Sequence, residues 1–182
     1  MAKKGGISLF ETQKKDKPKP EELCSRFLTD DNLNNGMRHL LAFCNELKMK
    51  PIWYATNSFK CSYKGKSVVS FGIGRGGREE ENWVTITVYI ADRDQINNFL
   101  SVQSDKTKHE YIQSLKLCTR CASCAPGFNV EVLGTFYNLC FKGHNIVFFK
   151  PTESQFEILE KFIVLRREYI KNFQKQPICV GK

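Results

Sequence analysis

The sequence has few histidines and no long hydrophobic run. Of its 182 residues only three are histidines, His39, His109 and His144, and no HExxH motif, serine-nucleophile elbow or phosphate-binding loop accompanies them. Because no catalytic group can be named, the sequence favours a non-catalytic protein without excluding an enzyme. No segment approaches the roughly 20 consecutive apolar residues that a membrane-spanning helix needs.

The first residues also lack the apolar stretch of a secretory signal peptide. We therefore expect a cytoplasmic protein that engages no membrane. In that reducing compartment the eight cysteines would remain mostly thiols, so a tight cluster of them indicates metal or redox chemistry rather than a disulfide framework. A chain of 182 residues can bury a hydrophobic core without disulfides.

Positive charge is unevenly spread along the chain. The formal net charge is +9, and residues 1–20 supply +4 of it, with six lysines against Glu11 and Asp16. We predict a basic flexible tail over residues 1–20, because a Lys/Pro/Gly-rich segment buries too little apolar surface to offset its ordering entropy. A nucleic-acid-binding arm is the alternative role for this tail, since basic segments attract phosphate. Residues 21–182 are expected to form one domain.

The first half of this domain has the pattern of helices followed by strands. Pro20 suits the first turn of a short helix, and an apolar stripe from Leu33 to Leu47 predicts a longer helix capped by Asp30 or Asp31. Strands are then predicted at 52–54, 59–63, 67–73 and 83–90, which together form an antiparallel meander.

The second half predicts two short helices, three short strands and a long final helix. The strands, at 130–133, 135–141 and 145–149, form either a small second sheet or an extension of the first. Thr152-x-x-Gln155 matches a capping box before the final helix. The predicted class is therefore α+β: an antiparallel β-meander packed on helices, with a C-terminal cysteine-cluster β-hairpin lobe over residues 118–150 and a long final helix.

Four cysteines with short spacing are the most specific feature of the chain. A tetrahedral zinc site needs four soft ligands that converge, and closely spaced cysteines plus one distant cysteine supply them. A closed four-cysteine site leaves no open position for water, so zinc would be structural rather than hydrolytic. The predicted ligands are Cys118, Cys121, Cys124 and Cys140.

Other interpretations of the cluster stay open. Its spacing is similar to one cluster site of bacterial ferredoxins, which makes an iron-sulfur cluster the alternative to zinc, although Phe141 stands where proline follows the last cysteine there. Ordinary thiols without metal, or His144 in place of one cysteine, are further alternatives. The Cys118-x2-Cys121 pair has dithiol spacing, but a predicted helix precedes it and Pro126-Gly127 follows, unlike the context of thioredoxin-like enzymes.

Two features of the meander bear on ligand binding. Gly72-x-Gly74-x-x-Gly77 matches the dinucleotide-binding fingerprint, but a strand is predicted where that fingerprint needs a helix, so residues 74–82 are interpreted as a hairpin loop. Aromatic side chains on one face of the meander would be available to bind a flat ligand or stack bases, with core packing as the alternative. The candidate pocket residues are Trp53, Tyr54, Tyr63, Trp83 and Tyr89.

A short segment resembles a known family. Tyr54, Phe59-Lys60, Tyr63-Lys64-Gly65-Lys66 and Val68-Val69-x-Phe71 resemble the core hairpin of YdhG-like small bacterial domains. The resemblance implies an α+β fold with an antiparallel sheet, and one branch of that family has been linked to frataxin-like iron handling. The cysteine cluster departs from the pattern. More broadly, a cysteine cluster followed by a hairpin and a long helix is similar to uncharacterised proteins of low-GC Gram-positive bacteria. No functional residue is implied by either resemblance.

The sequence leaves three functions in order of preference. The first is a non-catalytic binding protein with a structural zinc site, which engages a small molecule or a protein partner. The second is a nucleic-acid-binding adaptor, whose binding would fall with added salt. The third is an iron-sulfur redox or iron-handling protein.

Overall fold

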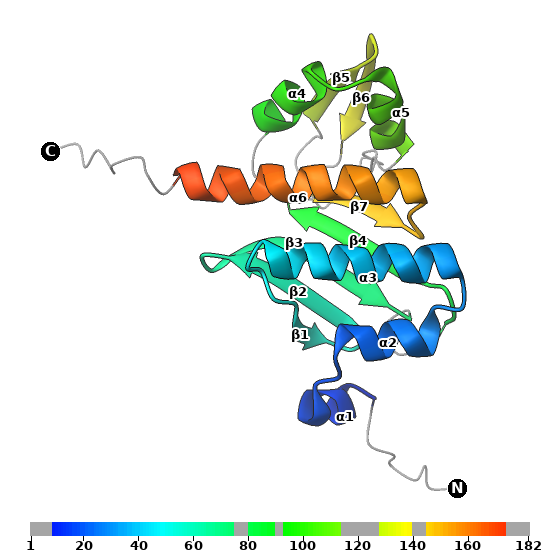
Figure 1. The fold of residues 1–182 in the computed structure, drawn as a ribbon. Helices are drawn as coiled ribbons and strands as arrows, with labels where there is room; N and C mark the ends of the chain where they lie inside the picture. The colour runs from blue at the N-terminus through cyan, green and yellow to red at the C-terminus, as the bar shows by residue number, and fades with distance from the viewer. Residues whose placement is uncertain (1–8, 75–79, 90–92, 114–127, 140–144, 174–182) are drawn as a thin grey trace, which may run out of the picture.

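The computed structural model describes residues 9–74, 80–89, 93–113, 128–139 and 145–173, which adopt an α+β fold (Figure 1). A five-stranded antiparallel sheet in the order β1-β2-β3-β4-β7 forms its centre, and β5 and β6 pair as a separate two-stranded sheet. The predicted α+β class and long final helix are confirmed. In chain order the elements are α1 (Leu9–Asp16), α2 (Pro20–Phe27), α3 (Asp31–Glu46), β1 (Ile52–Ala55), β2 (Ser58–Tyr63), β3 (Lys66–Ile73), β4 (Val84–Tyr89), α4 (Arg93–Ser101), α5 (Asp105–Gln113), β5 (Phe128–Val132), β6 (Thr135–Leu139), β7 (Asn145–Phe149) and α6 (Glu153–Phe173).

Side-chain caps fix where the helices begin. The carboxylate of Asp30 accepts a hydrogen bond from the backbone N–H of Leu33 at 2.8 Å, at the start of α3. Before α6, the Gln155 side chain accepts one from the backbone N–H of Thr152 at 3.1 Å, which is one half of the predicted capping box. These bonds occupy N–H groups that the first helical turn leaves without a partner.

One face of the five-stranded sheet forms the hydrophobic core. The strand register aligns Phe59, Phe71, Ile86 and Phe148 in a row across β2, β3, β4 and β7, and each is at most 1% exposed. Figure 1 shows α3 and α6 side by side across this face. They approach so closely that a Cβ atom at Gly36 would lie 2.3 Å from the Phe156 ring. Glycine is therefore required at this helix crossing.

A small lobe lies on the far side of α6 from α3 (Figure 1). It consists of α4, α5 and the β5-β6 hairpin, and it packs on α6 around Phe162. The Phe162 ring centroid lies 4.9 Å from that of Phe99 and 5.6 Å from that of Tyr111. Helix α6 thus packs on both the main sheet and the lobe.

The last of the three predicted short strands does not belong to this lobe. β7 pairs antiparallel with β4, with Ile146 opposite Val88 and Phe148 opposite Ile86. This corrects the predicted lobe boundaries of 118–150. The alternating apolar residues of β7 are buried when they extend the core face of the main sheet, whereas the short β5-β6 hairpin offers no comparable surface to cover them.

Part of the segment predicted as a flexible tail, residues 1–20, forms a helix. Residues 9–16 form α1, and Gln13 on this helix is only 6% exposed. Its side-chain oxygen accepts hydrogen bonds from the backbone N–H of Asn57 at 2.7 Å and from the indole N–H of Trp53 at 3.3 Å, and its amide N–H donates to the Asn57 side chain. A polar side chain therefore attaches α1 to the sheet, which an apolar periodicity does not reveal.

Candidate functional site

The cysteines predicted to bind metal lie outside the described residues, as does His144. Within the described ranges, no group of three or more His, Cys, Asp or Glu side chains is arranged to hold a metal ion. The three described cysteines, Cys24, Cys44 and Cys61, are buried thiols of the core. Burial raises the pKa of Cys24 to about 11, and a hydrogen bond with Cys44 together with burial raises the pKa of Cys61. The thiols of Cys24 and Cys61 therefore stay protonated at neutral pH and are poor nucleophiles.

The described residues next to the predicted ligands are paired in the β5-β6 hairpin. Phe128 and Leu139 are opposite each other in the β5-β6 pair. Cys140 directly follows Leu139, and Cys124 precedes Phe128 by four residues, a length of chain that spans at most about 14 Å. Both arms of the motif therefore begin at the same end of the hairpin.

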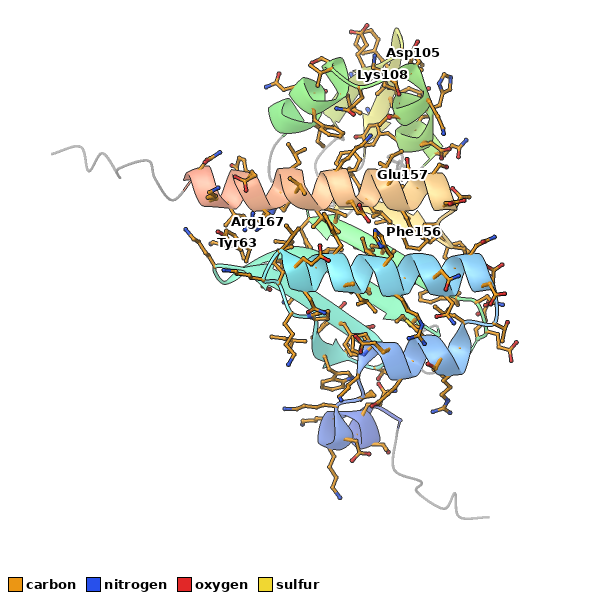
Figure 2. All side chains as sticks on the ribbon, in the orientation of Figure 1. Tyr63, Asp105, Lys108, Phe156, Glu157 and Arg167 are labelled. Atoms are coloured by element: carbon orange, nitrogen blue, oxygen red, sulfur yellow. The ribbon has the colours of Figure 1, made fainter. Side chains whose placement is uncertain are left out.

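The five aromatic residues predicted to line one pocket lie on separate surfaces. Trp53 points to the core side of the sheet, where Gln13 binds it. The guanidinium carbon of Arg167, in the C-terminal half of α6, lies 4.8 Å from the ring centroid of Tyr63 (Figure 2). The other three, Tyr54, Trp83 and Tyr89, lie on the opposite face of the sheet, as shown by the contacts of Tyr54 with Lys60, Trp83 with Gly72 and Phe149, and Tyr89 with Ser70.

Trp53 lines a groove of about 550 Å³ between the α1-α2 connection, the end of α3 and the β1-β2 hairpin. This volume lies within the range of small-molecule sites. Proline residues shape the groove because each fixes its own backbone φ angle. The apolar lining consists of Pro18, Pro20, Pro51, Ile52, Trp53 and Phe59.

The rim of the groove is positively charged. Lys17, Lys19 and Lys50 belong to its lining and are exposed, whereas Glu21 is the one carboxylate among the lining residues. The three amines and one carboxylate give the groove a net charge of +2. An apolar floor with a cationic rim is suited to a ligand that has a flat or aliphatic body and an anionic group.

Two hydrogen bonds of Gln13 hold the wall of this groove. They connect α1 to Asn57 in the β1-β2 turn and to the indole of Trp53. Because the indole N–H is occupied by Gln13, Trp53 offers its apolar ring atoms, rather than its donor, to a ligand. Sequence reasoning missed Gln13, Lys17, Lys19 and Lys50. The alternating Lys-Pro-Lys-Pro of residues 17–20 was the available signal, since it describes a stiff connection better than a flexible tail.

A second groove, of about 370 Å³, lies between the N-terminal parts of α3 and α6 and has the opposite character. Its lining includes Glu153, Glu157 and Glu160, and the Glu160 carboxylate lies 2.9 Å from the Nε2 atom of His39. Phe156, which Figure 2 labels between α6 and α3, and Glu157 also belong to its lining. The acidic residues there do not form a metal-holding group, so the lysine-rimmed groove is the better candidate ligand site.

The helices of the described ranges do not include one suited to crossing a membrane: α6, the longest at 21 residues, carries charged side chains along its whole length. Comparison with known proteins found no matching family model, no matching curated protein and no matching solved structure. The resemblance to YdhG-like domains therefore stays a prediction, and function is inferred from the geometry of this chain alone.

Proposed function

We propose that this protein is a non-catalytic binding protein whose ligand site is the lysine-rimmed groove. The observation that carries the proposal is the position of Trp53, which forms the wall of a 550 Å³ groove rimmed by Lys17, Lys19 and Lys50. Its ligand class is a small molecule with an anionic group beside a planar or aliphatic body. The apolar part would cover Trp53 and Ile52, and the anionic group would face the lysines.

The composition of the groove favours binding over catalysis. Its described lining contains no histidine, cysteine, serine or threonine. The Ser–His and Cys–His pairs that are common in covalent catalysis are therefore absent from these residues. Binding with a defined orientation requires only the apolar wall and the fixed positive charges.

A structural zinc ion is part of the same proposal. Cys118, Cys121, Cys124 and Cys140 would hold it at the open end of the β5-β6 hairpin. The pairing of Phe128 with Leu139 supports this proposal, because it starts both cysteine-bearing segments at one place. The zinc would cross-link the lobe and take no part in ligand binding, with an iron-sulfur cluster as the alternative group.

A fluorescence titration tests the groove. The chain has two tryptophans, so Trp83→Phe leaves Trp53 as the sole reporter. We expect an anionic planar probe, 8-anilinonaphthalene-1-sulfonate, to quench Trp53 in the folded protein. Replacing Lys17 or Lys50 by Ala should weaken binding about two- to fivefold, the size expected for one exposed charge.

Matched controls decide the interpretation. Lys106 and Lys161 are exposed lysines on α5 and α6 that do not line the groove. Lys106→Ala and Lys161→Ala should leave the probe affinity unchanged. If all four lysine variants behave alike, or if Trp53 fluorescence does not respond, the groove is not the ligand site.

A further inference from the structure

The face of the five-stranded sheet opposite the core is open among the described elements. Helices α2, α3 and α6 cover the core face (Figure 1). On the opposite face, Tyr54 is 48% exposed and Phe149 is 56% exposed. The open face is defined here by Tyr54, Lys60, Trp83, Thr85, Thr87 and Phe149, whose positions follow from the strand register and the ring contacts.

Aromatic rings lie near both edges of the open face. On the β7 side, the rings of Trp83 and Phe149 meet edge to face, with centroids 5.8 Å apart and an interplanar angle of 66°. The indole of Trp83 lies against the backbone at Gly72, where an added Cβ atom would be 3.2 Å from the ring. On the β1 side, Tyr54 is the exposed ring. Between them the strands carry hydroxyl side chains, among which Thr85 and Thr87 are partly exposed.

Each exposed ring is accompanied by a lysine. The ammonium of Lys60 lies 5.7 Å from the ring centroid of Tyr54, and that of Lys150 lies 5.6 Å from the ring centroid of Phe149. None of the five strands of this sheet contains an aspartate or glutamate. Glu80 and Glu81 precede Trp83 along the chain. Their segment is held to α2 by a hydrogen bond of 2.7 Å from the Asn82 N–H to the Phe27 carbonyl. The strands therefore carry positive charge and no negative charge.

We propose that the open face binds single-stranded nucleic acid. Unpaired bases stack on exposed aromatic rings, and adjacent lysines neutralise the phosphates that connect them. The hydroxyl groups between the rings supply donors and acceptors for base edges. Four strand spacings of about 4.8 Å separate β1 from β7, which gives a path of about 19 Å, long enough for a short run of nucleotides. A duplex would present its backbone rather than its base faces, so it would leave the rings without stacking partners.

Charge complementarity distinguishes this occupant from a protein partner. A protein interface would favour apolar side chains at its centre, whereas here Thr85 and Thr87 lie on a central strand and the exposed rings lie beside lysines. Ile52 and Val147, which pair with Lys60 and Thr87, are the aliphatic side chains of this face. This proposal does not rest on the lysine-rimmed groove. Lys60, Lys150 and Phe149 do not belong to the groove lining, so the two sites fail or succeed separately.

Trp83 gives a direct reporter of the open face. In a Trp53→Phe variant it is the sole tryptophan. We expect a mixed-sequence single-stranded oligonucleotide, tested as both DNA and RNA, to quench Trp83 at low salt. The logarithm of the affinity should fall linearly with the logarithm of the salt concentration. The same sequence as a duplex should bind at least about tenfold more weakly, since it cannot stack on the rings.

Two matched pairs of variants test the residues. Phe149→Ala should weaken binding about tenfold through loss of stacking, whereas Phe136→Ala removes an even more exposed ring from β6 and should change nothing. Lys60→Glu should weaken binding and lower the salt slope by at least about one, whereas Lys161→Glu makes the same charge change on α6 with no such loss. Circular dichroism confirms that each variant is folded.

Four results would overturn the proposal. The first is no response of Trp83 to any single strand at low salt. The second is equal weakening by Lys60→Glu and Lys161→Glu, which would indicate attraction by overall charge alone. The third is equal affinity for the duplex and the single strand. The fourth is capture of a protein by the open face. If Phe149→Ala abolishes that capture and oligonucleotides do not compete with it, the face is assigned to a protein partner.

Discussion

The main body and the lobe of this protein differ in how much of their stability their own side chains supply. The body, formed by the five-stranded sheet with α2, α3 and α6, buries rows of apolar residues from four neighbouring strands. The described part of the lobe buries few apolar side chains, among them Ile96, Leu100, Tyr111 and Val132, and leaves Val102 at 79% and Phe136 at 70% exposure.

This difference shows where a metal would matter. The body is large enough to fold on apolar burial alone. A small unit with little core of its own usually depends on a cross-link, and the proposed zinc site lies in the chain segments that flank the lobe's hairpin.

Loss of the metal should affect the lobe and spare the body. In small zinc domains the metal contributes about 10–16 kcal/mol of binding free energy, which is folding free energy for the unit it holds. We therefore expect Cys121→Ser to lose its zinc and its lobe protection in hydrogen exchange, while β3 and β4 remain protected. Elemental analysis with an absorption spectrum, on protein purified without oxygen, measures the metal.

Cys179→Ser is the matched control, since Cys179 lies outside the cluster spacing. It should retain about one zinc per chain and show a smaller melting shift than Cys121→Ser. Iron with a broad visible band would instead establish the iron-sulfur alternative. Equal melting shifts in the two variants, or protein without metal, would contradict a structural metal site.

Truncating the buried Phe71 of the body should lower the free energy of unfolding more than truncating the exposed Phe136 of the lobe. Phe71 is 1% exposed at the centre of the core row, so Phe71→Ala should lower the free energy of unfolding by about 3–5 kcal/mol. Phe136→Ala, on the exposed side of β6, should change it by less than about 0.5 kcal/mol. Urea denaturation measures both, and similar losses would mean that the lobe is as well packed as the body.

One added methyl group at the crossing of α3 and α6 should destabilise the protein. At an exposed helix position Gly→Ala gains up to about 1 kcal/mol, but at Gly36 the new Cβ would overlap the Phe156 ring. We expect Gly36→Ala to lower the free energy of unfolding by about 1–3 kcal/mol. The double variant Gly36→Ala/Phe156→Leu should recover part of this loss, and a stabilised Gly36→Ala would show that the helices separate freely.

Alkaline pH should weaken the body through its buried thiols. The pKa of Cys24 is raised to about 11 by burial, from 9.0. Between these values the unfolded chain releases the thiol proton while the folded chain keeps it, so the free energy of unfolding falls as pH rises. The loss from Cys24 should be about 1.4 kcal/mol at pH 10. Cys24→Ala should flatten the slope between pH 8 and pH 10, and an unchanged slope would assign the loss to other groups.

Local signals made most of the elements predictable from the sequence. Helix starts are marked by Asp30, which accepts a free N–H, by Pro20, which has none, and by Thr152, whose N–H bonds to Gln155. Strand alternation defines which residues of a strand share a face. Alternation does not say which helix covers that face. Strand register places the predicted pocket residues Trp53 and Trp83 on opposite sides of the sheet, since Trp53 is opposite the core residue Phe59 and Trp83 contacts Phe149.

The groove itself depends on distant residues and was not predictable. Gln13 and Asn57 are 44 positions apart, and neither belongs to an apolar pattern. The same limit applies to β7, whose sequence fits either sheet until the position of β4 is known. Long-range polar contacts and the choice of strand partner carry no local periodicity.

The attachment of α1 has a consequence for how the groove responds to solution conditions. Gln13 and Asn57 are both neutral amides, so their hydrogen bonds carry no net charge for dissolved ions to screen and no proton to gain or lose. The lysines at the rim of the same groove are fully subject to screening. Raising the ionic strength would therefore loosen an anionic ligand while leaving in place the wall against which it had rested.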